Sequence, residues 1–398
     1  MNKKVLIITS DYPPSPGIGS LNVSKLTKYL SKQGWCILVF TATLPPREIF
    51  STLPLEIPKQ RVVYLPWPDH SKGLNRFLYL FLGNVGWFFP AARKGIELVR
   101  SFKPNIILAT SPHHISQVVG YKLAKSSGIP FVSHLRDPWT IDPHFSKLRL
   151  TNILGKLFEK KVFSSASAII VVSEGFADFY ARLSKRPVYV IHNAFDPDDF
   201  PSNVELDNTF TLLFAGSIYR GTRDITPLLR ALKNLAQKGL LKEFPIQIKL
   251  FLPDDDMEVV ITMLKKYPEI KHLFKLYPWT SHSVVVQEEL RATYLLLPLE
   301  FNKASWYFYS GKLFEYMGAR RPILSIGSKH NLAAKLIEKM GIGINCESAE
   351  EIEEFLLKAL KSFYLENNIE KIEWEKIKDF SWENQARQIG EILEKYAQ

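Results

Sequence analysis

Short apolar runs alternate with amphipathic helical segments along most of the chain. The runs lie at residues 5–9, 37–41, 106–110, 131–134 and 169–172 in the first half, and at 211–215, 246–251, 276–277, 294–298 and 323–326 in the second. Strands that alternate with helices are typical of parallel sheets whose crossover helices cover both faces. The pattern therefore predicts an α/β protein with two doubly wound parallel sheets.

A chain of 398 residues is too long for one compact core. The stretch 196–203 between the two series of strands is acidic and irregular and contains two prolines, as expected of an interdomain linker. We expect an N-terminal domain over 1–195, a C-terminal domain over 196–378 and a final helix over 379–398. Residues 350–396 read as helical throughout, with one break at 380–382.

The chain carries 51 lysines and arginines against 40 aspartates and glutamates, a formal charge of +11. This charge suits nucleic acid, an anionic membrane or phosphorylated substrates. Because no zinc-finger spacing, RNP-like motif or basic tail is present, we expect no nucleic-acid partner. Cys36 and Cys346 lie beside strand-like runs in opposite halves, which predicts buried thiols in a reducing compartment. No apolar run approaches the roughly 20 residues of a membrane span, which favours a cytoplasmic protein.

The stretch 74–90 is rich in apolar and aromatic residues, among them Trp87, Phe88 and Phe89. Its flanks are basic, with Lys72, Arg76, Arg93 and Lys94. Such a segment can lie in the interface of an anionic membrane. It can also pack as a buried helix against a sheet. Both interpretations stay open from the sequence.

A candidate anion site follows the last long apolar run, where a helix is expected to open at Ser310 and Gly311. Lys312 would lie in the first turn, where the helix dipole favours a carboxylate, and this indicates that an anion binds there. Glu315, one turn further on, suits a ribose diol, and phosphate beside ribose indicates a nucleotide. The alternative is an ordinary helix in which Leu313 is a core residue and both charges are solvated.

Residues 310–324 resemble the nucleotide-sugar motif S-K-L-F-E-Y-x-A-A-G-[KR]-P-[IV]-L of the GT-B glycosyltransferases of family 4. Four further stretches agree with this family in order along the chain, at 10–19, 136–139, 190–196 and 214–217. The resemblance implies two Rossmann-like domains facing an interdomain cleft, with the final helix packing back on the N-terminal domain. It also implies transfer from a nucleoside-diphosphate sugar with retention of configuration, without a catalytic metal or a cofactor.

The resemblance assigns roles to loops at the carboxyl ends of the strands, where open parallel sheets bind ligands. A basic pair would neutralise the leaving diphosphate, with Arg223 preferred over Arg220. The implied nucleotide-sugar site comprises Gly17, Gly19, Gly216, Arg220, Arg223, Trp279, Thr280, Ser310, Gly311, Lys312, Leu313 and Glu315. The implied catalytic set is Arg136, Asp137, Arg223 and Lys312. Asp137 could act on the acceptor hydroxyl, and a structural ion pair with Arg136 is the alternative.

Several positions depart from the family pattern. Arg136 stands where many members carry a histidine, and His134 lies two positions too early. Tyr307 replaces the first glutamate of the E-x7-E motif, so sugar contacts would come from Asn302, Ser305 or backbone groups.

Two clusters superficially suggest metal sites. The acidic triplet 254–256 precedes a helix, which favours N-capping over metal binding. His113 and His114 are adjacent and cannot share one helix face, so no zinc site is expected.

Near the N-terminus, the loop 11–19 is rich in proline and glycine, and a helix is expected to start after it at Ser20 or Asn22.

Together these features predict a cytoplasmic glycosyltransferase, peripheral on the inner face of the membrane. Its partners would be a nucleoside-diphosphate sugar, a glycan or lipid-linked acceptor, and an anionic membrane surface. No residue stands out as a covalent nucleophile, which favours a front-face displacement assisted by the leaving diphosphate. The alternatives are a non-catalytic nucleotide-sugar-binding or scaffold protein and a UDP-sugar epimerase of the same architecture. The sequence identifies neither the base and sugar of the donor nor the linkage formed.

Overall fold

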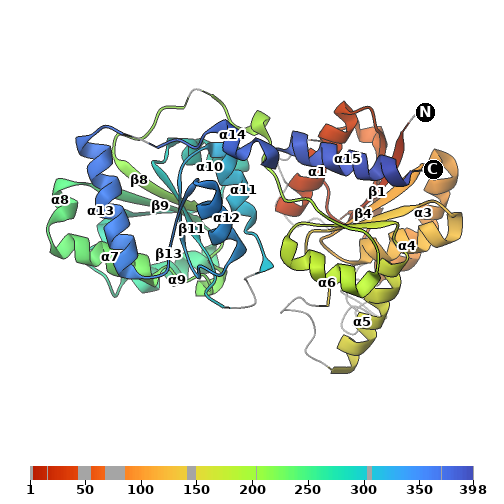
Figure 1. The fold of residues 1–398 in the computed structure, drawn as a ribbon, viewed down its shortest axis with the longest axis horizontal. Helices are drawn as coiled ribbons and strands as arrows, with labels where there is room; N and C mark the ends of the chain where they lie inside the picture. Colours follow the sequence, from red (N-terminus) through yellow and green to blue (C-terminus); the bar gives the residue numbers. More distant parts are fainter. Residues whose placement is uncertain are drawn as a thin grey trace. The chain divides into compact units, whose positions relative to one another are not determined.

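The computed structural model describes residues 3–15, 17–43, 55–67, 86–140, 149–202, 204–302, 307–368 and 370–397, without the side chains of 149–154. The chain forms two compact units, here called unit 1 (Met1–Asn193 with Trp382–Gln398) and unit 2 (Ala194–Ser381). Each unit carries a parallel sheet whose strands alternate with helices (Figure 1). The prediction of two α/β domains with doubly wound sheets is confirmed.

The sheet of unit 1 has the strand order β3-β2-β1-β4-β5-β6-β7, and its described pairs are all parallel. Strand β1 is central, since Val5 pairs with Ile37 of β2 on one side and with Ile106 of β4 on the other. The strand order reverses between β1 and β4, which makes a switch point of the kind where open sheets bind ligands. The bounds are β1 (Lys4–Ile8), β2 (Cys36–Thr43), β3 (Val62–Pro66), β4 (Ile106–Thr110), β5 (Phe131–Leu135), β6 (Ala168–Val171) and β7 (Val188–Val190).

The helices of unit 1 include the one nearest the carboxyl terminus. Helix α15 packs against α1, where a Cβ on Gly390 would lie 2.6 Å from Gln33 Oε1. The start predicted for α1 is wrong, because the helix begins at Ile18 and Asn22 is buried inside it. The bounds are α1 (Ile18–Lys32), η1 (Lys59–Arg61), α3 (Phe88–Phe102), α4 (Ile115–Ser127), α5 (Arg149–Ser164), α6 (Glu174–Ser184) and α15 (Trp382–Tyr396).

The sheet of unit 2 has the order β10-β9-β8-β11-β12-β13 with parallel described pairs. Along β8, Phe210, Leu212 and Phe214 belong to one apolar core, and Leu213 and Ala215 belong to the other. This two-residue alternation shows why both faces of the sheet are covered. The bounds are β8 (Phe210–Ala215), β9 (Ile246–Leu252), β10 (Phe274–Pro278), β11 (Tyr294–Pro298), β12 (Ile323–Ile326) and β13 (Gly343–Cys346).

Helices flank this sheet. The prediction that residues 350–396 are helical with a single break at 380–382 is wrong, because residues 366–373 have no helical structure where they are described. The bounds are η3 (Pro197–Asp199), η4 (Tyr219–Gly221), α7 (Thr226–Gln237), α8 (Leu240–Glu243), α9 (Asp254–Leu264), η5 (Lys271–Leu273), α10 (His282–Arg291), α11 (Gly311–Ala319), α12 (Leu332–Met340), α13 (Ala349–Leu365), α14 (Trp374–Ile377) and η7 (Lys378–Phe380).

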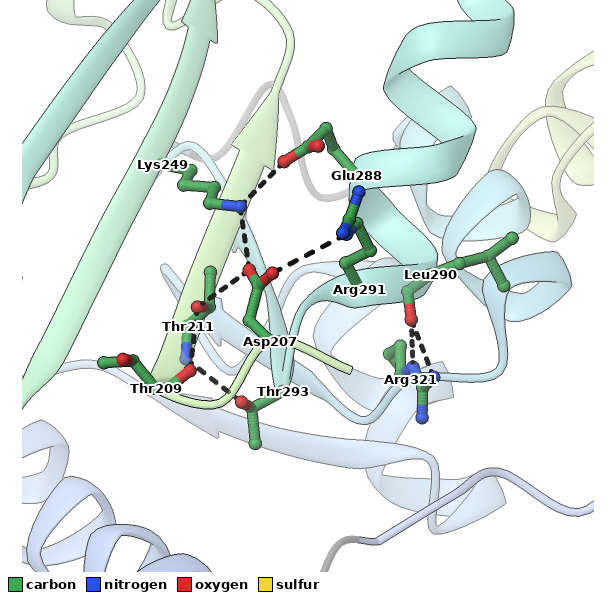
Figure 2. A network of polar contacts seen from close by, with 9 residues as sticks. All are labelled: Asp207, Thr209, Thr211, Lys249, Glu288, Leu290, Arg291, Thr293 and Arg321. Carbon is green, nitrogen blue, oxygen red and sulfur yellow. Dashed lines mark hydrogen bonds and ion pairs between the residues drawn. The ribbon is translucent and has the colours of Figure 1, made fainter. Parts of the chain in front are cut away.

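A polar network anchors α10 to the sheet of unit 2 (Figure 2). Lys249 on β9 contacts Asp207 Oδ2 at 2.7 Å and Glu288 Oε2 at 2.8 Å. Asp207 Oδ1 also faces Arg291 Nε at 3.7 Å. Burial lowers the pKa of Lys249, but hydrogen bonds to the two carboxylates outweigh it and leave the pKa raised. Arg321 donates two hydrogen bonds to the Leu290 carbonyl, 3.0 and 2.7 Å long, near the end of the helix. The carboxyl-terminal end of α10 is therefore fixed from two sides.

The aromatic stretch 74–90 is described only from residue 86 onward. Trp87 is fully buried and stacks on Phe40 and Trp67, with ring centroids 5.5 and 5.7 Å apart. Phe89, two residues later in the chain, is 72% exposed. Trp87 thus belongs to the core of unit 1 and does not face a membrane. Among the described residues, no helix is both long and apolar enough to cross a bilayer.

The two cysteines are both free. Cys346 is buried as predicted, and burial raises the pKa of its thiol to about 12. Cys36 is only half-buried, because it lies at the start of β2 beside the Arg61 guanidinium, whose Nη1 is 3.6 Å from the sulfur.

Candidate functional site

The candidate site of unit 2 lies at the carboxyl edge of its sheet. Because the strands are parallel, the loops after β8, β10 and β11 all leave the sheet at this edge. The loop after β11 leads into α11, whose first residue is Gly311 and whose N-cap is Ser310. No acidic side chain lies in the first turn of α11. The helix start has the form that the sequence predicts for an anion site.

Lys312 contacts two carboxylates within unit 2. Its Nζ lies 2.7 Å from Glu315 Oε1 on the same helix and 3.2 Å from Glu289 Oε1 on α10. His282, at the start of α10, adds a contact of 3.7 Å from Nε2 to Glu315 Oε1. The side chain of Lys312 as a whole is 20% exposed. Lys312 is thus already balanced by acidic neighbours, a feature that the sequence did not reveal.

The pKa values of the two carboxylates in this cluster are shifted in opposite directions. Burial, and after it the negative charge of Glu315, raises the pKa of Glu289 well above its ordinary value. Burial acts on Glu315 in the same direction, but Lys312 and His282 oppose it and the pKa of Glu315 is lowered. Burial also lowers the pKa of Lys312, and the two carboxylates overcome this and raise it to about 12. The ammonium group of Lys312 therefore favours the ionised form of Glu315, whereas burial favours the protonated form of Glu289.

Glu289 is a functional candidate that sequence reasoning missed. It is fully buried, together with Val285 and Val286 of the same helix. A residue three and four positions after two buried valines lies on their helix face. That spacing is the signal that could have found it, because a glutamate on an apolar face needs a partner. The partner, Lys312, is 23 residues away and is brought near only by the fold.

The two arginines after β8 have different surroundings. The Arg220 side chain is 76% exposed and pairs with Asp255 at 2.6 Å. Arg223 is 15% exposed, and its guanidinium carbon lies 4.6 Å from the centroid of the Tyr219 ring. Its Nη1 donates to the Ser217 carbonyl at 3.2 Å, and its Nε lies 3.9 Å from Glu300 Oε1 after β11. Arg223 is thus the arginine that lies between the loops after β8 and β11.

Asp256 holds the loop that carries both arginines. Its Oδ2 accepts hydrogen bonds from Ser217 Oγ at 2.6 Å and from the Ile218 amide at 2.9 Å. Its Oδ1 accepts from the Arg220 amide at 2.7 Å. The triplet 254–256 lies in the first turn of α9, but the N-cap is Pro253, so the predicted capping role is wrong. The Asp256 carboxylate binds the loop after β8 and does not cap the N-terminus of α9.

The remaining predicted residues of unit 2 are spread along the same edge. Trp279 is 64% exposed after β10, and Thr280 beside it is half-buried. Leu313 is fully buried in the core, and a Cβ at Gly216 would lie 3.0 Å from the Phe214 ring. Asn302, also predicted as a sugar contact, is exposed and donates to Glu300 at 3.3 Å. Tyr307 is 55% exposed, and Ser305 lies outside the described residues.

A second cluster lies in unit 1, at the carboxyl ends of β1, β4 and β5. Arg136 Nη1 donates to the Gly19 carbonyl at 3.0 Å. Ser111 Oγ accepts from the amides of Arg136 at 2.9 Å and of Asp137 at 3.4 Å. A Cβ on Gly19 would lie 3.0 Å from Asp11 Oδ2, so the close approach there favours glycine. Two of the stretches that resemble the family, 10–19 and 136–139, thus meet near the switch point of this sheet.

The charges of this second cluster depend on one another. Burial lowers the pKa of Arg136 to about 10, although Asp137 and Asp11 act in the opposite direction. Burial raises the pKa of Asp11 against the opposing effects of His113 and Arg136. Arg136 Nε is buried and has no hydrogen-bond partner among the described residues. Gly17, the other predicted glycine, has φ +106° as the N-cap of α1, with open space around it.

Two histidines near this cluster, His134 and His114, are packing residues, whereas His113 is exposed. His134 is buried within β5 next to Thr110, and burial lowers its pKa to about 3. His114 stacks on Trp139 with a centroid distance of 5.1 Å, and burial lowers its pKa to about 4. Neutral, enclosed rings do not suit contact with a sugar. No metal-binding group of three or more acidic, histidine or cysteine side chains occurs in the described part of the chain.

A buried carboxylate supports the segment that follows Arg136 and Asp137. Glu159 on α5 is fully buried and accepts hydrogen bonds from the Thr140 hydroxyl and from Tyr180 Oη, the latter at 3.0 Å. Tyr180 Oη in turn accepts from the Trp139 amide at 2.9 Å. Burial raises the pKa of Glu159 despite these hydrogen bonds. The network leaves no local pattern in the sequence, because its members lie on three separate segments.

Comparison with known proteins adds the family context. Residues 22–199 match the family model described as Glycosyltransferase Family 4, and no curated protein matches the sequence. A glycosyltransferase from Rickettsia africae ESF-5 is 13% identical with a TM-score of 0.67, covering 100% of this chain and 99% of the other. Sucrose-phosphate synthase from Thermosynechococcus elongatus is 15% identical with a TM-score of 0.68 and 98% coverage of both chains. The HepE protein of Anabaena in complex with UDP is 15% identical with a TM-score of 0.70, covering 98% and 100%.

The two parallel-sheet units and their structural neighbours define a protein of the GT-B fold. Its resemblance to the glycosyltransferases of family 4 is confirmed by the match over residues 22–199.

Proposed function

We propose that this protein is a glycosyltransferase that moves a sugar from a nucleoside-diphosphate donor to an acceptor hydroxyl. The observation that carries the proposal is the Lys312–Glu315 pair near the N-terminus of α11, at the sheet edge where Arg223 is also found. A cation and a carboxylate one turn apart at a helix N-terminus suit a phosphate and a ribose. A similar fold in HepE of Anabaena was solved with UDP and with UDP-glucose, which supports a nucleotide-sugar donor here.

Arg223 is the side chain best suited to the diphosphate. Its guanidinium group is oriented by the Tyr219 ring and the Ser217 carbonyl, and its contact with Glu300 is long. A planar guanidinium can bind phosphate oxygens through two parallel hydrogen bonds. Lys312 would add a second positive charge. We infer that these cations neutralise the leaving diphosphate and that the reaction needs neither a metal nor another cofactor.

The transfer would retain the anomeric configuration. In a front-face displacement, the bond from the anomeric carbon to the diphosphate oxygen breaks while the acceptor oxygen bonds to the same face. The acceptor proton then passes to the departing diphosphate. In unit 1, Asp137 and Arg136 would orient the acceptor, and the raised pKa of Asp11 makes it a further candidate for contact with the acceptor hydroxyl. The acceptor would be a glycan or a lipid-linked precursor.

The proposed location is the cytoplasmic face of an anionic membrane, without a spanning helix. The charge of +11 supports this, since each basic residue near an anionic surface contributes about 1 kcal/mol. Co-sedimentation with anionic vesicles at low and high salt tests it. Binding that disappears at high salt is expected, whereas no binding at low salt would rule the membrane out as a partner.

Two observations favour a second function, a non-catalytic nucleotide-sugar-binding protein. Lys312 is already held by two carboxylates, and Tyr307 stands where the family motif has a glutamate. A panel of nucleoside-diphosphate sugars distinguishes the two functions when both thermal shift and release of nucleoside diphosphate are measured. The transferase predicts slow donor hydrolysis that is lost in Arg223→Ala. A stabilising donor that is never cleaved, with or without glycan and lipid-linked acceptors, indicates the binding protein.

A further inference from the structure

Glu289 is a fully buried carboxyl group that has no part in the sugar transfer proposed above. Its Oε1 accepts from Lys312 Nζ at 3.2 Å, and its Oε2 has no hydrogen-bond donor among the described residues. That oxygen is available to carry a proton. The side chain lies on the buried face of α10 and reaches Lys312 of α11.

The charges around Glu289 come from two helices and one loop. Helix α11 contributes Lys312, Glu315 and the buried Tyr316, and α10 contributes His282 through its contact with Glu315. Arg223 acts on Tyr316 from the loop after β8. Two carboxylates therefore share a single ammonium group, and two ionised carboxylates would leave the trio with a net negative charge. A buried pair of this kind holds one proton between its members.

The position of Glu289 is fixed by the helix that carries it. Its neighbour Glu288 contacts Lys249 at 2.8 Å, and Arg321 holds the Leu290 carbonyl at 2.7 Å (Figure 2). These contacts lie on both sides of Glu289 in the sequence. The carboxyl group is thus presented to Lys312 by an anchored segment and cannot easily turn to solvent.

We propose that Glu289 is a positioning residue of the donor site, a neutral carboxylic acid that holds Lys312 and Glu315 in register and keeps their pair free of excess negative charge. This inference rests on the proposed function and explains how the same site can accept a diphosphate. The neutral acid accepts a hydrogen bond from Lys312 and can donate its own proton to Glu315. A diphosphate then meets an ammonium group opposed by one carboxylate, whereas an ionised Glu289 would add a second and repel the ligand.

Three variants of the full-length protein test this inference, with UDP as the probe. Glu289→Gln keeps the shape and stays neutral, Glu289→Ala removes the hydrogen bonds, and Glu288→Gln is the matched control on the same helix. Infrared difference spectra without nucleotide should show that Glu289→Gln loses the carbonyl band of a protonated carboxylic acid and that Glu288→Gln keeps it. UDP affinity, measured by calorimetry between pH 6 and 9, should fall about tenfold or more in Glu289→Ala and be restored largely by Glu289→Gln.

The pH dependence separates positioning from simple packing. The ratio of Glu289→Gln affinity to wild-type affinity should rise with pH, because only the wild-type side chain can ionise. A flat ratio, or a Glu289→Gln loss as large as that of Glu289→Ala, would overturn the proposal. So would protonated-acid bands that are the same in Glu289→Gln as in wild type, since Asp11 and Glu159 can contribute bands of their own. If wild-type protein binds no UDP or other nucleoside diphosphate, the donor-site proposal fails instead, and the infrared spectra still decide the protonation of Glu289.

Discussion

Arg136 and Gly19 are 117 residues apart in the sequence, and a hydrogen bond of 3.0 Å joins the guanidinium of one to the carbonyl of the other. This contact links the loop after β5 to the first turn of α1, beside Asp11. Arg136 thereby takes a position in unit 1 that a histidine could not fill, because a histidine has neither the reach nor a permanent charge.

Replacing Arg136 with alanine should lower the free energy of unfolding of unit 1 by about 2–4 kcal/mol. The change removes the bond to Gly19 and leaves Asp11 and Asp137 without their shared cation. Urea unfolding monitored by tryptophan fluorescence measures it. Arg100→Ala, an exposed arginine of α3, is the charge-matched control and should change stability little. Equal effects of the two variants would contradict a structural role for Arg136.

The two arginines after β8 should differ in their effect on UDP binding. Arg223→Ala is expected to weaken affinity by about 1.5–3 kcal/mol, the range for hydrogen bonds that involve a charged group. Arg220→Ala should have little effect, since its side chain points to solvent and pairs with Asp255. Calorimetry with UDP checks both. A larger loss in Arg220→Ala than in Arg223→Ala would reverse the assignment.

Asp256 should be needed for the shape of this loop. Asp256→Ala removes three hydrogen bonds to Ser217, Ile218 and Arg220, and we expect it to destabilise unit 2 by about 2–4 kcal/mol. It should also weaken UDP binding, because Arg223 lies on the same loop. Asp255→Ala is the control, with its carboxylate exposed in a surface pair. Thermal unfolding and calorimetry on both variants measure these effects, and wild-type UDP affinity in Asp256→Ala would argue against the loop's role.

If Glu315 binds the ribose, its removal should abolish recognition of the sugar hydroxyls. Wild-type protein should bind UDP more tightly than 2′,3′-dideoxy-UDP by about 1.5–3 kcal/mol, and Glu315→Ala should bind the two alike. The comparison matters because Glu315 also holds Lys312, so a loss of affinity alone would not identify the ribose contact. Discrimination that survives in Glu315→Ala would place the ribose elsewhere.

Acid should destabilise unit 1 through His134. Its pKa is lowered from 6.5 to about 3 by burial, so the folded state favours the neutral ring. The stabilising contribution is fully present above pH 6.5 and is lost as the pH falls toward 3. At pH 5 the loss amounts to about 2 kcal/mol. His134→Asn should show a weaker decline in urea midpoint between pH 7 and 5. The same substitution at His272, an exposed position, should leave the decline as in wild type.

The central strands could be predicted from the sequence, whereas three strands at sheet edges were missed. The edge strand β10 was predicted through the run at 276–277. Strands β1, β4 and β8 are buried along nearly their whole length, which gives continuous apolar runs. Strands β3, β7 and β13 lie at sheet edges and are half-exposed over much of their length, so their composition is mixed and no run stands out.

The candidate site of unit 2 was predictable only in part, because some of its residues form a local motif and others are brought in by the fold. Residues 310–315 form a local motif, and a helix start after a strand follows from the order of residues alone. The partners Glu289 and Asp256 act over distances of 23 to 39 positions along the chain. Their roles depend on which helix packs beside which loop, and a single sequence does not contain that information.

The packing of α15 into unit 1 constrains the order in which the protein can be completed during synthesis. The ribosome makes residues 194–381, all of unit 2, before it makes Trp382–Tyr396. Unit 2 can therefore close on the nascent chain while α1 still lacks the helix that covers it around Gly390. Many two-domain proteins fold from the amino terminus onward, but here the second unit is the first that can be finished.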